Sequence, residues 1–269
     1  MSRFEPNLER YFDALSDEQK EAKVGQAIPK AGWIRKLYER YNSSLGIQKL
    51  PTDSTFLFLG PGTGEELVVA GERRLWQDKR LVTVDWKPGS RLRYICRTRN
   101  IPLIADSYLN PDGIFGHISQ LDRPSPRVVT ARNAQIVDYV FTGKPNFGLP
   151  TGSAIEERTD GIVLYTNRSL AGALAEYASR VVRREGGGAF LYTVATVFER
   201  DILVESLNQV GIIPIITQAS RSADFAPPPD LWKEDRVSGA SIVPDQFHLV
   251  GNSIRPINSA HVPSGLAEV

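Results

Sequence analysis

The spacing of apolar residues along the chain changes near residue 50. Before that point they recur three and four positions apart, which predicts amphipathic helices over residues 5–45, with a break at Ser16 and a second helix over 30–42. After Pro51, short apolar runs alternate with helical segments, which is typical of a parallel sheet covered by helices on both faces. The pattern therefore predicts a helical extension over residues 1–50 and an α/β domain over residues 51–269.

Within the α/β part, the short apolar runs predict strands at residues 55–59, 81–84, 101–105, 127–131, 161–166, 189–194, 212–217 and 246–251. The helical segments fall at residues 64–77, 112–121, 169–184 and 198–210. Two stretches, at about 142–160 and 219–241, are loop-like insertions, and loops of this length in a compact domain are usually functional or disordered. We expect these loops, together with the N-terminal helices acting as a lid, to cover a substrate.

One strand-to-helix junction carries candidate chemistry. Gly60, Gly62 and Gly64 follow the apolar run at 55–59 and open a helical segment. Glycines there permit a tight turn and let a ligand approach the backbone, while the start of the helix presents unpaired amide groups. Asp85 ends the next predicted strand about 20 residues later, where a carboxylate can accept hydrogen bonds from both hydroxyls of a ribose. The junction therefore predicts a site for an adenosine-containing cofactor.

The motifs around this junction resemble those of the class I S-adenosylmethionine-dependent methyltransferase family. FLGPGTGEE resembles the first motif of that family, VTVDW the second and PLIADSY the third. The resemblance covers roughly residues 55–217. It implies a doubly wound, mostly parallel seven-stranded sheet with helices on both faces and an antiparallel last strand. It also implies S-adenosyl-L-methionine as the cofactor.

The resemblance assigns cofactor-binding roles to residues of these motifs. Asp85 is expected to bind the ribose, Trp86 to pack on the adenine, and Asp106 to lie near the adenine amino group. The other implied cofactor-binding residues lie in the glycine turn and in the third and fourth motifs: Gly60, Pro61, Gly62, Thr63, Gly64, Glu65, Ser107 and Asn133.

The glycine spacing separates this family from dinucleotide enzymes. The turn reads G-x-G-x-G, whereas a dinucleotide turn reads G-x-G-x-x-G, and Glu65 stands where its third glycine is expected. The chain also departs from the methyltransferase pattern, because Phe58 stands two residues before the first glycine, where the family often has an acid. Glu65 or Glu66 is then the candidate partner of the methionine amino group.

The fourth motif has two candidates, RVVTARNA at 127–134 and GIVLYTN at 161–167. If the first is the fourth strand, Asn133 borders the methyl group and the loop after it is an active-site insertion. If the second is, Tyr165, Asn167 and Arg168 take that place. Asn133 and Tyr165 are therefore the candidate catalytic residues.

Composition limits the partners, the metal sites and the location that we expect for this protein. The 32 basic and 31 acidic residues give a net charge of +1, which by itself predicts neither a nucleic-acid nor a membrane partner. The single cysteine, Cys96, excludes an internal disulfide and a multi-cysteine zinc site, and the histidines lack metal-type spacing, so we expect no metal. The charged start of the chain, and apolar runs far shorter than about 20 residues, predict a soluble, cytoplasmic protein.

Methyl transfer from a sulfonium is an in-line displacement, so positioning supplies much of the catalysis and the lack of a catalytic triad agrees with it. Cys96 lies outside the fourth motif, where a cytosine-C5 enzyme needs its nucleophile. The expected activity is methyl transfer to an oxygen or nitrogen atom of a small molecule, a peptide or RNA, with the oligomeric state unknown. Two alternatives stay open: a methyltransferase-fold binding partner without catalysis, and an NAD(P)-dependent oxidoreductase.

Overall fold

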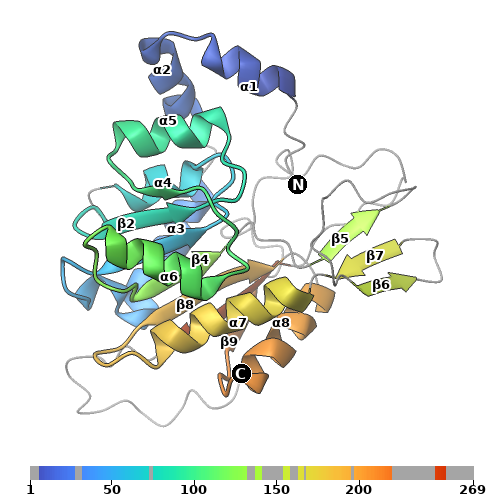
Figure 1. Ribbon diagram of the computed structural model, residues 1–269. Helices are drawn as coiled ribbons and strands as arrows, with labels where there is room; N and C mark the ends of the chain where they lie inside the picture. Colours follow the sequence, from blue (N-terminus) through green and yellow to red (C-terminus); the bar gives the residue numbers. More distant parts are fainter. Residues whose placement is uncertain are drawn as a thin grey trace.

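The computed structural model describes residues 6–27, 32–72, 75–131, 137–140, 154–157, 163–166, 168–194, 197–219 and 246–252. These residues form an α/β fold in which a mostly parallel sheet carries helices on both faces (Figure 1). The predicted α/β class, with a mostly parallel sheet between helices, is confirmed.

The main sheet has the strand order β3-β2-β1-β4-β8-β10-β9. Neighbours from β3 to β8 pair in parallel, whereas β10 pairs antiparallel with both β8 and β9. Its strands are β1 (Thr55–Leu59), β2 (Arg80–Val84), β3 (Leu103–Ile104), β4 (Val128–Ala131), β8 (Ala189–Val194), β9 (Ile215–Ala219) and β10 (Gln246–Asn252).

The side chains of β1 alternate between two cores, one on each face of the sheet. Phe56 and Phe58 belong to the first core, and Leu57 and Leu59 to the second. The first core is covered by α3 (Gly32–Leu45), α4 (Glu65–Ala70) and α5 (Ser90–Thr98), and the second by α6 (Pro111–Gln120), α7 (Arg168–Val182) and α8 (Val197–Gln209). Burial on both sides explains why this strand is a continuous apolar run rather than an alternating one.

The third N-terminal helix, α3, is part of the first core. Its Tyr38 stacks on Trp76 with ring centroids 4.3 Å apart, and Trp76 Nε1 donates a 2.7 Å hydrogen bond to Asn42 Oδ1. The two preceding helices, α1 (Pro6–Asp13) and α2 (Asp17–Ala27), lie beside α5 instead, where Phe12 meets Tyr94 edge-on at 5.8 Å (Figure 1). A short 3-10 helix, η2 (Ile47–Lys49), connects α3 to β1.

A second, three-stranded antiparallel sheet is inserted in the chain between β4 and α7. It contains β5 (Val137–Val140), β6 (Ala154–Glu157) and β7 (Val163–Thr166) in the order β5-β7-β6. The prediction that residues 142–160 form a loop is therefore wrong for β6. This segment lacks a strong strand pattern, and it becomes a strand because it pairs with β7. The rest of that loop, and residues 220–241 of the second predicted loop, lie outside the described residues.

The apolar pattern also misses a helix. It predicts no element over residues 90–98, where α5 lies, because arginines interrupt the apolar positions. Leu92, Ile95 and Cys96 are nevertheless spaced three and four apart, and all three are buried against the sheet. Because charged and apolar residues alternate in this segment, its apolar residues alone do not indicate a helical period.

Candidate functional site

The glycine turn joins β1 to α4 in a conformation that favours glycine at three positions. Gly60, Gly62 and Gly64 have φ angles of 59°, 62° and 85°, in the left-handed region that other residues rarely adopt. The Gly60 N–H donates a 2.8 Å hydrogen bond to the carbonyl oxygen of Val84, which holds the turn beside the end of β2. The predicted tight strand-to-helix turn is confirmed.

Gly64 is also required by packing. A Cβ added there would lie 2.9 Å from Ile95 Cδ1 and 3.2 Å from Leu92 Cδ1, so the missing side chain lets the start of α4 approach α5. This contact brings together the two helices that follow β1 and β2. The turn and the segment after β2 are thereby held as one unit.

We expect Gly64→Ala to lower the free energy of unfolding by about 2–4 kcal/mol, because it adds left-handed backbone strain to a clash with Ile95. Urea denaturation measures this loss. Gly116→Ala is the matched control, since nothing lies within 4 Å of its added Cβ in the middle of α6, and it should stabilise the protein slightly. Equal denaturation midpoints for Gly64→Ala and wild type would contradict the described turn.

The acids that follow the turn are engaged in different ways. Glu65 accepts a hydrogen bond from the Thr63 hydroxyl through Oε2, and its Oε1 lies 3.0 Å from Arg91 Nη1. Glu66 is fully buried and accepts a 2.8 Å hydrogen bond from the Tyr38 hydroxyl of α3. Glu66 thus anchors a helix in the core, and the suggestion that it meets a ligand's amino group is wrong. Glu65 stays at the turn, oriented by Arg91.

Phe58, the residue found where the family often has an acid, is completely buried. Its ring lies 6.2 Å from that of Trp76, on the α3 side of the sheet. The side chain at this position therefore serves the core. Recognition of an amino group at this end of the turn must come from other groups.

Asp85 lies directly after β2, next to the turn. It is only 8% exposed, and its Oδ1 accepts a 2.9 Å hydrogen bond from the Lys87 N–H. Burial raises the pKa of Asp85, while the Lys87 N–H and the charge of Arg93 act in the opposite direction. Its other oxygen, Oδ2, accepts no hydrogen bond from the part of the chain that the structure describes. That oxygen is available to a ligand hydroxyl.

The residues after Asp85 and after β3 form the outer rim of this region. The Trp86 side chain is 59% exposed. Asp106 accepts a 2.6 Å hydrogen bond from the Ser107 N–H and lies 3.4 Å from His117 Nε2 of α6. The side chain of Asp106 remains 45% exposed. Asp106 thus takes part in a local turn while still facing solvent, and its adenine contact stays a prediction.

The strand order decides between the two candidates for the fourth strand. β4, from the first candidate, pairs with β1, whereas β7, from the second, pairs only with β5 and β6 among the described residues. The hypothesis that 161–167 is the fourth strand is therefore wrong. Asn133 lies outside the described residues, and the structure describes the backbone of Tyr165, on β7, without its side chain.

Two contacts of the site have no counterpart in the sequence pattern. Arg91 pairs with Glu65 across two helices, and the ring of Tyr108 lies over Gly60. Neither pair shares a motif. The only hint in the sequence is that Tyr108 is the last residue of the third motif, PLIADSY, which lies at the same edge of the sheet as the turn.

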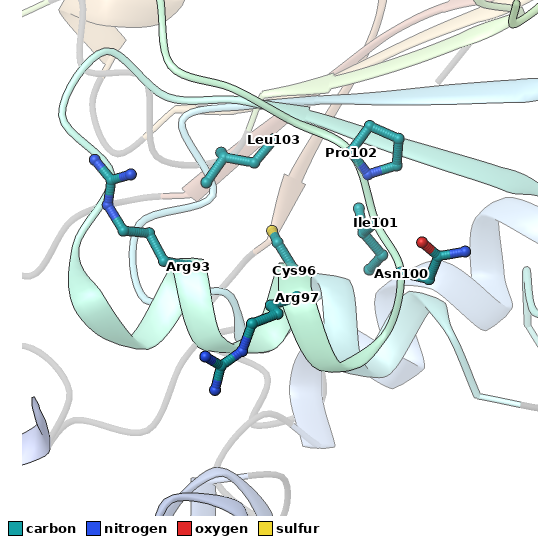
Figure 2. Close-up of a pocket in the computed structure, with 7 residues that line it drawn as sticks. All are labelled: Arg93, Cys96, Arg97, Asn100, Ile101, Pro102 and Leu103. Atoms are coloured by element: carbon teal, nitrogen blue, oxygen red, sulfur yellow. The ribbon is translucent and has the colours of Figure 1, made fainter. Parts of the chain in front are cut away.

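A hollow of about 480 Å³ lies along the edge of the sheet between α5 and β3 (Figure 2). It is lined by Arg93, Cys96, Arg97, Asn100, Ile101, Pro102 and Leu103, and it includes no residue of the glycine turn. The Cys96 thiol is buried, and burial, with the charge of Asp85, raises its pKa to about 12. A thiol of this kind is a poor nucleophile at neutral pH, as the sequence predicts.

The described residues contain no cluster of His, Cys, Asp and Glu that could bind a metal ion. Within the same residues, every helix is too short or too polar to cross a membrane.

Scans against models of protein families and against curated proteins found no match. Solved structures match at low identity. Fibrillarin from Aeropyrum pernix, in complex with natively bound S-adenosyl-L-methionine, is 14% identical over 81% of this chain and 76% of its own, with a TM-score of 0.45. An O-methyltransferase family protein from Burkholderia thailandensis is 12% identical over 86% of this chain and 58% of its own, also at 0.45.

A third structure, precorrin-6y C5,15-methyltransferase from Geobacter metallireducens, is 12% identical over 76% of this chain and 80% of its own, with a TM-score of 0.40. Two of the three descriptions name a methyltransferase, and the other names bound S-adenosyl-L-methionine. At these identities and scores, the similarity identifies neither an activity nor a substrate for this chain.

Proposed function

We propose that this chain is an S-adenosylmethionine-dependent methyltransferase that moves a methyl group to an oxygen or nitrogen acceptor. The observation that carries the proposal is the glycine turn with Asp85 beside it. At three left-handed glycines the turn carries no side chains of its own between its backbone and a ligand, and Oδ2 of Asp85 accepts no hydrogen bond from the described residues. These two features fit a ribose attached to a group that lies along the turn.

The strand order supports S-adenosylmethionine over a dinucleotide. A dinucleotide fold has parallel strands in the order 3-2-1-4-5-6. Here β10, the last strand of the chain's described part, is antiparallel and lies between β8 and β9. An antiparallel last strand in a seven-stranded sheet is what the resemblance to class I methyltransferases implies, and Glu65 occupies the position of a dinucleotide turn's third glycine. The strand order and the turn therefore favour S-adenosylmethionine over a nicotinamide dinucleotide.

In this proposal each part of the site has one role. The turn from Gly60 to Glu65 binds the ribose and the amino-acid part of the cofactor, and Asp85 accepts hydrogen bonds from the ribose hydroxyls. Trp86 packs on the adenine, and Asp106 and Ser107 border its amino group. Asn133, which follows β4 in the chain, is the proposed group near the acceptor, whereas Tyr165 loses its candidacy because β7 is not the fourth strand.

When bound, the cofactor supplies a methyl group on a positively charged sulfur, a good leaving group for in-line displacement. The glycine turn and Asp85 would hold the cofactor, and transfer of its methyl group to the acceptor would leave a neutral thioether and release the acceptor's proton to solvent or to a nearby base. The chain's own part is to align the reactants and to exclude water, which can supply much of the rate enhancement. A base is needed only for a weakly nucleophilic acceptor.

The acceptor is proposed to be a small molecule, a peptide or RNA, bound at the carboxyl edge of the sheet. The three-stranded sheet follows β4 in the chain, beside the place proposed for the methyl group. On the other side, the Ser90 hydroxyl at the start of α5 donates a 2.8 Å hydrogen bond to Asp13 Oδ2 at the end of α1. The hydrogen bond holds α1 beside the segment that follows Asp85, and we propose that α1, α2 and the insertion act as a lid, whereas α3 packs in the first core. A cytoplasmic location is part of the same proposal.

A methyltransferase-fold binding protein without catalysis is the second candidate. Phe58 is buried in the core, and Glu65 is already paired with Arg91 and hydrogen-bonded to Thr63. The methionine end of the cofactor thus lacks the acid that the family often uses. This observation favours a protein that keeps the methyltransferase fold and binds a partner but does not catalyse methyl transfer.

Calorimetric titration of the wild-type chain with S-adenosylhomocysteine and, separately, with NADH tests the cofactor assignment. We expect binding of the first ligand in a 1:1 ratio and none of the second, because the turn and the strand order fit the first. Binding of NADH alone would support the oxidoreductase. Binding of neither ligand would support the methyltransferase-fold binding protein without catalysis.

A further inference from the structure

The ring of Tyr108 lies against the backbone of Gly60. A Cβ added to Gly60 would be 3.5 Å from Tyr108 Cε1 and 3.7 Å from its hydroxyl oxygen, which is ordinary contact distance. Gly60 is the first residue of the tight turn, and a ligand that lies along the turn must pass close to its backbone. The phenol ring therefore occupies the space through which a ligand would approach the turn.

The same ring also lies near Asp85. Gly60, which the ring contacts, is adjacent to the end of β2, because β1 and β2 pair from Thr55↔Arg80 to Leu59↔Val84 and the Gly60 N–H donates a hydrogen bond to the Val84 carbonyl oxygen. Asp85 follows Val84 directly. Burial raises the pKa of the Tyr108 hydroxyl to about 12, and the charge of Asp85 acts in the same direction. Tyr108 thus lies at the edge of the sheet where the glycine turn meets the acid proposed to bind the ribose.

Only packing holds the ring in this place. Tyr108 packs at the margin of the second core, and its hydroxyl has no hydrogen-bond partner among the residues that the structure describes. Its backbone is held more firmly, since the Leu109 N–H donates to Ser107 Oγ at 3.3 Å and Asn110 caps α6. A change of side-chain rotamer can therefore remove the ring without breaking a hydrogen bond or moving the main chain.

We propose that Tyr108 is a further residue of the cofactor site, whose ring fills the ribose end of that site and must turn away before the ligand binds. This inference rests on the proposed function. It makes Tyr108 a determinant of cofactor affinity, because the apparent dissociation constant rises as the fraction of molecules with an open site falls. Ligands whose binding free energy is smaller than the cost of moving the ring are excluded from the site.

Titration of S-adenosylhomocysteine into wild type, Tyr108→Ala and Tyr108→Phe tests this role. We expect Tyr108→Ala to bind about tenfold more tightly, because no ring has to be displaced from apolar contact. Tyr108→Phe should bind like wild type within about twofold, since it keeps the ring and loses only a hydroxyl without a hydrogen bond. Leu109→Ala, next in the chain, is the control for general loosening of this segment.

The outcomes separate this inference from the proposed function. If wild type binds and Tyr108→Ala binds equally or more weakly, the cofactor assignment stands and the displaced-ring inference is overturned. If no variant binds the ligand, both fail. A crystal structure of the wild-type complex decides the matter even if Tyr108→Ala does not fold: a ring moved off Gly60 supports the inference, and a ring still in contact with Gly60 beside the bound ligand overturns it.

Discussion

Replacing Asp85 with alanine is expected to weaken the binding of S-adenosylhomocysteine by at least about 100-fold. A carboxylate that accepts two ribose hydroxyls makes charge-assisted hydrogen bonds, each worth about 1.5–3 kcal/mol, and the variant leaves both hydroxyls unpaired in a confined site. Asp85 is suited to this role because it is 8% exposed and only its Oδ1 is engaged, by the Lys87 N–H. Isothermal titration calorimetry measures the change.

Two variants sharpen this experiment. Asp201→Ala removes an acid of α8 that is 59% exposed and pairs only with the adjacent Arg200, so it should bind like wild type. Asp85→Asn keeps the shape and an acceptor oxygen but loses the charge, and it should fall between wild type and Asp85→Ala. Undiminished binding by Asp85→Ala would show that the ligand lies elsewhere.

Loss of binding in Asp85→Ala should occur without loss of stability. Burial raises the pKa of Asp85 in the folded protein, so the fold holds this proton more tightly than the unfolded chain does. The wild type therefore loses stability as the pH rises from about 4 through the raised pKa, while the variant lacks this loss. Thermal unfolding at neutral pH should show a midpoint for Asp85→Ala no lower than that of wild type, which identifies the acid as functional rather than structural.

Trp76→Ala is expected to lower the free energy of unfolding by about 3–5 kcal/mol, the largest loss predicted for a single side chain here. Trp76 is fully buried, stacks on Tyr38 at 4.3 Å, and meets Phe56 edge-on at 5.0 Å. Its removal leaves a cavity between α3 and β1. For a chain of this size the melting temperature should fall by about 10 °C, as measured by calorimetry or circular dichroism.

Two control variants separate the stability lost through the cavity from the stability lost with the hydrogen bond between Trp76 and Asn42. Trp76→Phe keeps an aromatic ring but leaves Asn42 Oδ1, in a residue 4% exposed, without its donor, so the loss should be intermediate. Trp86→Ala removes a tryptophan that is 59% exposed and should change the unfolding free energy by less than about 0.5 kcal/mol. A small effect of Trp76→Ala would mean that α3 does not depend on this contact.

The parts of this protein that depend on local physics were predictable from the sequence. Gly60, Gly62 and Gly64 adopt left-handed backbone angles that other residues avoid, so their spacing alone marks a tight turn. The run FLFL is apolar at every position because β1 is buried on both faces, and Asp85 marks the end of β2. From these positions the α/β class and the place of the proposed cofactor site follow.

Only the tertiary structure decided what depends on contacts between distant segments. Residues 127–131 and 161–166 are both short apolar runs, and only pairing with β1 shows that the first belongs to the main sheet and the second does not. Helix α5 acquires its buried face from the sheet beneath it, despite the arginines between its apolar residues. Contacts between distant segments depend on how the whole chain packs, so no local pattern could place Phe58 against Trp76 or Tyr108 over Gly60.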